Sequence, residues 1–217
     1  LGVVRILRES AGTPLESLTI RAGLEDAVAR LAEQGVDVAP DAVDAALEFT
    51  IGRFAQLLRD EGTSADLVAA ILPAADAPGR AARLLSELSA SAEDQRLRDL
   101  VATLVRITRI LPESALLEVR CGAEPRKDAT RSFLSEPAEL VLAEAVDAIP
   151  SGTAEQPISV ILDRTVDVVA KASTFFDEIL VNAEDADVRA ARHGLLAAVL
   201  ALAPSDIDWK AVDTALG

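Results

Sequence analysis

The sequence predicts an all-α fold, a bundle of about nine helices in which a helical linker region precedes a second helical domain. Half of the 217 residues are hydrophobic, and Ala and Leu, both strong helix formers, supply most of that content. Apolar residues recur at helical spacing, whereas the alternation typical of strands is nearly absent. Aromatic residues make up only 3% of the chain, and none is Tyr.

The first half of the chain divides into five predicted helices. Residues 1–9 have the pattern of an apolar helix that is ending. Thr13, Pro14 and Glu16 match a capping box with proline at the first helical position, which predicts that the next helix starts there. Breaks at Pro and Gly, together with helical spacing between them, then predict helices over residues 14–33, 40–61, 64–72 and 80–90.

The second half has a less regular start. Ser91 to Asp94 cap a helix that runs to Leu111, and residues 112–135 are irregular and rich in basic residues. We expect a helix over residues 136–148 with Leu140, Val141 and Ala145 facing inward. Two long helices follow, over residues 157–181 and 182–203, with the second starting at Asn182. A terminal turn or short helix is expected over residues 207–216.

A soft domain boundary is predicted near residue 90, which separates residues 1–90 from residues 91–217. The loop at residues 73–79 is the clearest break before it. The chain has no Met and begins within an apolar pattern, so we expect it to be a piece of a longer protein.

Composition also indicates where in the cell the protein is located and whether it holds a disulfide or a metal ion. No apolar run is long enough for a transmembrane helix and no signal peptide opens the chain, so we expect a cytoplasmic protein without a membrane partner. Cys121 is the only cysteine and His193 the only histidine, and a disulfide or a metal site is therefore not expected. We interpret Cys121 as a small buried or half-buried apolar residue and His193 as a packed or cap-facing one.

No catalytic motif is present, so no catalytic residue is predicted and no cofactor is expected in this chain. Glycine-rich phosphate loops, zinc-protease patterns and nucleophile elbows are all absent. Neighbouring carboxylates are common, but in an acidic helical protein such pairs are typical of solvated faces and caps. Asn182 to Asp185 fit a helix cap.

Two arginine pairs are the candidate binding residues. The net charge is −15, which argues against a general nucleic-acid binder, yet eight basic and five acidic residues fall between Arg96 and Arg131. Arg106 and Arg109 lie three residues apart, as do Arg189 and Arg192, and arginine forks suit phosphate oxygens. These arginines also fit a solvated face, or pairing within a helix such as Asp185 with Arg189. Phe175 and Phe176 fit either a core or a base-stacking platform.

The tail from Phe175 to Val199, FFDEILVNAEDADVRAARHGLLAAV, resembles the C-terminal signature of the beta subunit of bacterial heterotetrameric glycyl-tRNA synthetase. Three further segments resemble that family in the same order along the chain. They are LGVVRILRES (residues 1–10), LEFTIGRFAQLLRDEGTSADLVAAIL (residues 47–72) and LVRITRIL (residues 104–111).

The resemblance implies that residues 1–90 are the end of an HD-like helical domain with its linker, and that residues 91–217 are an anticodon-binding-type helical domain. It implies a non-catalytic, tRNA-binding part of glycine–tRNA ligase, whose alpha subunit (or a fused alpha region) uses ATP with Mg. Its partners would be glycine tRNA and that alpha subunit. The expected tRNA contacts are Arg106, Arg109, Arg189, Arg192, Arg120, Arg126 and Lys127.

An acidic all-helical module that binds a protein through an apolar groove is the alternative. An exposed Leu/Val patch, with the arginines paired to nearby acids, would favour it. An arginine-lined face free of such pairing would favour tRNA binding.

Overall fold

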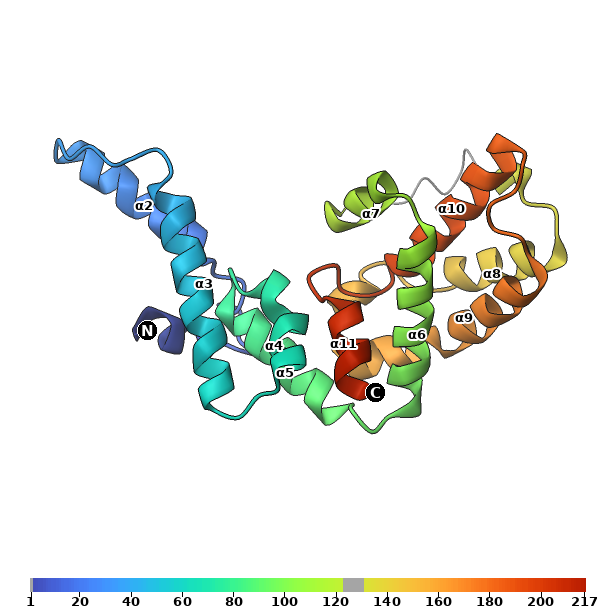
Figure 1. Cartoon of the computed structure of the whole chain (residues 1–217), viewed down its shortest axis with the longest axis horizontal. Helices are drawn as coiled ribbons and strands as arrows, with labels where there is room; N and C mark the ends of the chain where they lie inside the picture. Colours follow the sequence, from blue (N-terminus) through green and yellow to red (C-terminus); the bar gives the residue numbers. More distant parts are fainter. Residues whose placement is uncertain (1, 123–130) are drawn as a thin grey trace. The chain divides into compact units, whose positions relative to one another are not determined.

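The computed structural model describes residues 2–122 and 131–217, and within these ranges the fold is all-α, as the sequence predicts (Figure 1). The described residues form eleven α-helices and three short 3-10 helices, somewhat more than the nine helices expected. The chain divides into two compact units. The first comprises Leu1–Ser89 with Asp206–Ala215, and the second comprises Ala90–Ser205 with the last two residues.

The first unit contains the five helices of the N-terminal region and most of the last helix of the chain. Long helices α2 and α3 pack against each other, and α3 also contacts α4. Phe54, Val68, Ile71 and Leu84 are among its fully buried side chains, and Trp209 is buried as well. The helices are α1 (Gly2–Arg8), α2 (Ile20–Glu33), α3 (Ala42–Asp60), α4 (Ala65–Ile71), α5 (Pro78–Ala90) and α11 (Trp209–Leu216), with η1 (Leu72–Ala74) after α4.

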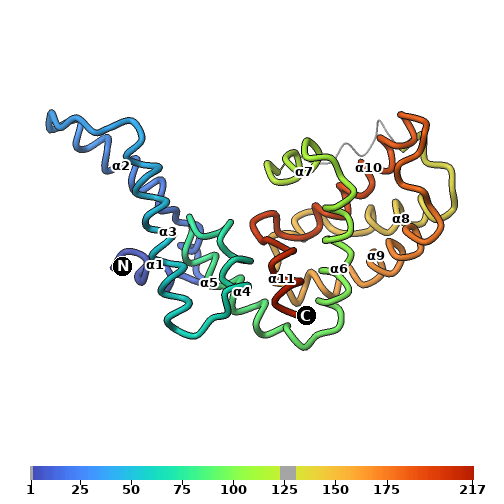
Figure 2. The backbone as a smooth tube through the Cα atoms, in the orientation of Figure 1, coloured from blue at the N-terminus to red at the C-terminus, as the bar shows by residue number. Residues whose placement is uncertain are grey.

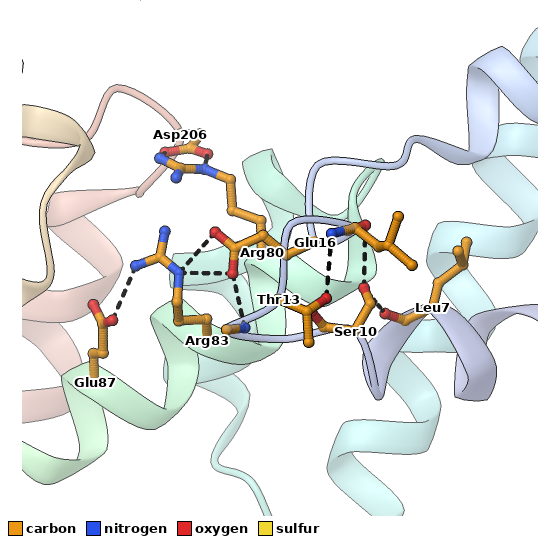
Figure 3. A network of polar contacts seen from close by, with 10 residues as sticks. Leu7, Ser10, Thr13, Glu16, Arg80, Arg83, Glu87 and Asp206 are labelled. Carbon is orange, nitrogen blue, oxygen red and sulfur yellow. Dashed lines mark hydrogen bonds and ion pairs between the residues drawn. The ribbon is translucent and has the colours of Figure 1, made fainter.

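A polar network holds the segment between α1 and α2 against α5 (Figure 3). Arg83 Nε donates to both carboxylate oxygens of Glu16, at 3.0 Å each, and its Nη1 donates to Glu87. Gly79 permits this approach, because a Cβ there would lie 2.3 Å from Ser10 Oγ and 2.9 Å from Glu16 Cα. A side chain at position 79 would therefore push the segment away from α5.

This network explains why the predicted helix start at Thr13 is wrong. Helix α2 begins at Ile20, and Thr19 Oγ1 caps it by accepting a hydrogen bond from the Ala22 N–H. Glu16 does reach back, to the Gly12 N–H at 2.9 Å, but residues 11–17 form turns. Because Glu16 is also bound to Arg83, the tertiary contact overrides the local helix signal.

The second unit is built around α9, which packs against both α6 and α8 (Figure 2). Helix α10 contacts α6, α7 and α8 and completes the core. The inner face of α6 is apolar, since Leu97, Leu100, Leu104 and Ile107 are buried. The elements are α6 (Gln95–Ile110), α7 (Glu113–Arg120), η2 (Arg131–Phe133), α8 (Pro137–Asp147), η3 (Thr153–Glu155), α9 (Ile158–Glu178) and α10 (Ala186–Leu200).

Three details of this unit differ from the sequence-based expectation. Helix α7 lies in a stretch predicted to be irregular, and α10 begins at Ala186 with Asp185 as its cap, not at Asn182. On α8 the predicted inward face is partly wrong, because Leu140 and Val141 are 50% and 44% exposed while Leu142 and Val146 are buried. Glu139, which is fully buried, lies on the inner face of the helix instead.

Candidate nucleic-acid interface

The last turns of α6 present Arg106 on the solvent side of the helix. The positions that face inward are apolar and buried, so the helical period leaves the arginines outside. The Arg106 guanidinium carbon lies 4.2 Å from the centre of the Phe176 ring, a cation–π contact, and Nη2 is 3.5 Å from the Phe176 carbonyl oxygen. Phe175 beside it is fully buried, and the two rings meet edge to face at 5.7 Å.

Arg109 and Arg120 are exposed, and within the described residues neither makes a hydrogen bond or an ion pair. Arg109 is one turn beyond Arg106 on α6, and Arg120 is the last residue of α7. Both guanidinium groups are therefore open to a ligand from solution.

Arg192 on α10 occupies a different environment. Its Nε donates to Glu139 Oε1 at 2.5 Å, its Nη1 donates to the Leu180 carbonyl at 2.8 Å, and the side chain is only 12% exposed. Glu139 is 0% exposed and also accepts hydrogen bonds from the Ser135 and Glu136 N–H groups, which caps α8. This ion pair ties α8 to α10.

The pKa of Glu139 reflects these contacts. Burial by itself raises the pKa of the carboxyl group, because the charged form loses its hydration. Hydrogen bonds from the Glu136 N–H, Arg192 and the Ser135 N–H favour the carboxylate and outweigh burial, so the pKa lies below its ordinary value. Glu139 is therefore a buried anion at neutral pH, paired with the Arg192 cation.

Arg189 binds the backbone before α10 rather than an acidic side chain. Its Nη1 donates to the carbonyl oxygens of Ala183 at 2.6 Å and Glu184 at 3.2 Å. Asp185 accepts from the N–H groups of Asp187 and Val188 and so caps the helix. The possible ion pair between Asp185 and Arg189 therefore does not form. Asp185 caps α10, and Arg189 binds the backbone carbonyls that precede the helix.

His193 completes the contacts around this backbone. Its Nε2 lies 3.0 Å from Asn182 Oδ1, and the ring is half-buried, which agrees with a packed or cap-facing role. Burial, and then the charge of Arg189, lower the pKa of His193. A neutral ring is therefore favoured at this position.

The four side chains converge on residues 176–184, which we call the exit segment because the chain leaves α9 there. Arg106 reaches it from α6, and Arg189, Arg192 and His193 reach it from α10. Phe176 lies in the last turn of α9, whose carbonyl groups lack intrahelical partners and carry the negative end of the helix dipole, so the Arg106 cation is well matched to it. Three of the four candidate arginines thus meet around one segment, and of these only Arg106 is exposed.

The remaining basic residues of the Arg96–Arg131 stretch vary in their surroundings. Arg96 pairs with Asp94 and Asp163, Arg98 with Glu93, and Arg131 with Asp147. Two expected tRNA contacts, Arg126 and Lys127, lie outside the described residues. Among the described arginines of this stretch, those without an acidic partner are Arg106, Arg109 and Arg120, which lie in the last turns of α6 and α7.

Glu139 is the residue of this region that the sequence reasoning missed. Its signal was its position three residues after Glu136, the spacing of a capping box, but nothing local indicated burial. Cys121 was expected to be buried or half-buried, and this is wrong, since it is exposed just after α7.

No group of three or more His, Cys, Asp or Glu residues in the described part of the chain is placed to bind a metal ion. No helix among the described residues is long and apolar enough to cross a membrane. A pocket of about 280 Å³ opens between the ends of α7, α8 and α10, but none of the arginines lines it.

The known proteins that are similar to the chain are described as glycine–tRNA ligase beta subunits. A glycine–tRNA ligase beta subunit from Leptothrix cholodnii is 34% identical over 202 residues, which covers 91% of the chain and 26% of the relative. The corresponding proteins of Erwinia tasmaniensis and Actinobacillus pleuropneumoniae serotype 7 are 33% and 30% identical, over 91% and 90% of the chain. No protein-family model matches the chain.

The chain spans about a quarter of the length of these relatives, 26% to 27%, in their C-terminal portion. The match covers 91% of the chain, so it extends over both compact units. Over nine-tenths of its length, this chain therefore belongs with the C-terminal portion of the glycine–tRNA ligase beta subunits.

Proposed function

We propose that the chain is a tRNA-binding part of a glycine–tRNA ligase beta subunit and that it recognises the anticodon arm. The observation that carries this proposal is the exposed arginine pair on α6, which no carboxylate of the described chain neutralises, in a chain related to those subunits. Guanidinium groups that are free of acidic partners suit the phosphates and bases of RNA.

In this proposal the parent enzyme joins glycine to tRNA, with ATP and Mg used by an alpha subunit or a fused alpha region. The present chain does not carry out the chemistry. It supplies affinity for glycine tRNA and helps to hold that tRNA for its partner, at a cytoplasmic location.

The arginines divide into two roles. Arg106, Arg109 and Arg120 contact RNA directly because their guanidinium groups are exposed. Arg189 and Arg192 act through the exit segment, whose backbone they hold in place. Arg126 and Lys127 remain proposed phosphate contacts on the strength of the sequence.

Binding of the chain to a glycine tRNA transcript at low salt tests the proposal. We expect specific binding, with weaker competition by the same tRNA bearing an altered anticodon. Arg109→Ala should lower the affinity several-fold and reduce the slope of log K against log salt by about one, as expected for a lost phosphate contact.

Arg59→Ala is the matched control for this test. Arg59 is an exposed arginine of the first unit, so its removal changes the net charge equally but lies outside the proposed surface. A comparable loss of affinity in both variants would indicate general electrostatic attraction instead of a defined site. Absence of tRNA binding at low salt would refute the proposal.

A second candidate function is binding of a protein partner. The observation that favours it is the exposure of neighbouring Leu140 and Val141 on α8, close in sequence to the ion-paired Glu139. Leu140→Lys would then abolish binding of that partner and leave tRNA binding unchanged, so the tRNA titration separates the two functions.

A further inference from the structure

The stacked pair of Arg106 and Phe176 differs from the other arginine contacts of the second unit. The guanidinium carbon lies over the ring, 4.2 Å from its centre, which is within cation–π distance. The only hydrogen bond of the Arg106 side chain to a described residue is long, at 3.5 Å to the Phe176 carbonyl. Arg106 is exposed and Phe176 half-buried, so the flat group lies on an apolar base and faces solvent.

The charges next to this pair are unfavourable for a phosphate. Asp177 and Glu178 follow Phe176 directly, and both are exposed. Carboxylates this close in sequence repel the RNA backbone and reduce the benefit of an Arg106–phosphate contact. A nucleobase is neutral and has a π face, so it can stack on a guanidinium plane without meeting that repulsion.

We propose that the Arg106–Phe176 pair receives an unpaired nucleobase, which stacks on the solvent-facing side of the Arg106 guanidinium. This inference rests on the proposed function, because an anticodon loop supplies bases outside a duplex. It assigns Arg106 to a base and leaves Arg109, one turn away, to the backbone. Phe175, which is fully buried, anchors the last turn of α9, the turn that carries Phe176.

The test compares two RNAs and three variants of the chain. One RNA is the anticodon stem-loop of a glycine tRNA, and the other is the same stem extended into a continuous duplex without a loop. Arg106→Lys keeps the charge and removes the plane, and Phe176→Leu removes the ring beneath it. Arg109→Lys is the matched control, since it makes the same chemical change at the neighbouring arginine.

We expect Arg106→Lys to weaken stem-loop binding about 10-fold, which corresponds to the loss of one stacked base. Phe176→Leu should weaken it by a similar factor, whereas Arg109→Lys should change it less than about 2-fold. Binding of the duplex should be the same for the wild type and Arg106→Lys, because a duplex offers no free base. Thermal unfolding of each variant verifies that the fold is retained.

Three results would overturn the inference, and they differ in what they say of the proposed function. Stem-loop binding that Arg106→Lys leaves unchanged would refute the platform alone, because RNA binding would persist. If Arg106→Lys weakened binding of the duplex and of the stem-loop by the same factor, Arg106 would contact phosphate and not a base. No binding of either RNA by the wild-type chain would refute the platform and the proposed function together.

Discussion

The two arginine pairs of the second unit have the same spacing in the sequence and opposite surroundings in the structure. Arg106 and Arg109 on α6 are exposed, and no carboxylate of the described chain pairs with them. Arg192 on α10 is 12% exposed and bound to a fully buried glutamate, and Arg189 is half-buried against backbone carbonyls.

The difference shows that spacing alone does not assign a role to an arginine. On α6 the inward positions are filled by apolar side chains, which directs the arginines to solvent. On α10 the buried Glu139 and the carbonyls of the exit segment provide partners inside the unit. Arginines with satisfied donors maintain the fold, and those with open donors remain available to a ligand.

The strongest test of this comparison is removal of Arg192. Arg192→Ala leaves the Glu139 carboxylate buried without its cation, so we expect the second unit to lose about 3 to 5 kcal/mol of unfolding free energy. Hydrogen exchange of α8 and α10 amides across a urea series reports on that unit separately. A loss below about 1 kcal/mol would contradict a structural role for the pair.

A smaller effect is expected at Arg189. Arg189→Ala removes the charged donor from the Ala183 and Glu184 carbonyls, and we expect a loss of about 1.5 kcal/mol. Faster hydrogen exchange at the first amides of α10 should accompany it, because the segment before the helix is no longer held. If protection there matches the wild type, the backbone contact does not stabilise the exit segment.

The pH dependence of the unfolding free energy tests the contribution of the Glu139 carboxylate to the same ion pair. Because the pKa of Glu139 is lowered in the folded state, its contribution is complete above the ordinary glutamate pKa of about 4.3. That contribution declines as the pH falls through the lower, folded-state pKa. Urea midpoints between pH 7 and pH 3 should therefore fall less steeply for Glu139→Gln than for the wild type. Equal slopes would show that Glu139 does not contribute to acid unfolding.

The smallest effects on stability are expected on α6. Arg106→Ala should cost about 0.5 to 1 kcal/mol through loss of the cation–π contact, and Arg109→Ala should stay within about 0.5 kcal/mol. The same urea and hydrogen-exchange measurements give both values. A loss at Arg109 as large as that at Arg192 would remove the distinction between the two pairs.

The fold class and most helices could be predicted because their signals are local. The sequence predicted a helix from the Ser91–Asp94 cap to Leu111, and α6 spans Gln95–Ile110 with Asp94 as its cap. The start of α2 could not be predicted, since Glu16 is bound to Arg83, which is 67 residues away. Helix α7 was missed because its short apolar pattern lies in a stretch of mixed charge.

The candidate site was predictable only as a set of residues. The sequence selected the four arginines of α6 and α10, but their division depends on Glu139, which is 53 residues from Arg192. Burial of a glutamate has no local signature, because the same residue type is normally solvated. The Arg106–Phe176 contact likewise joins positions 70 residues apart, so spacing could not reveal which phenylalanine lies under a guanidinium.

The last described helix has a consequence for how the chain is made. Arg80 is bound to Asp206, the Asp208 N–H donates to the Ala70 carbonyl, and residues 206–215 belong to the first unit. Residues 1–89 leave the ribosome before residues 206–215, so the first unit lacks its final helix until more than a hundred further residues have been synthesised. The second unit can therefore fold before the first is complete, and a fragment cut near residue 90 would lack the buried Trp209 and Val212 of its own unit.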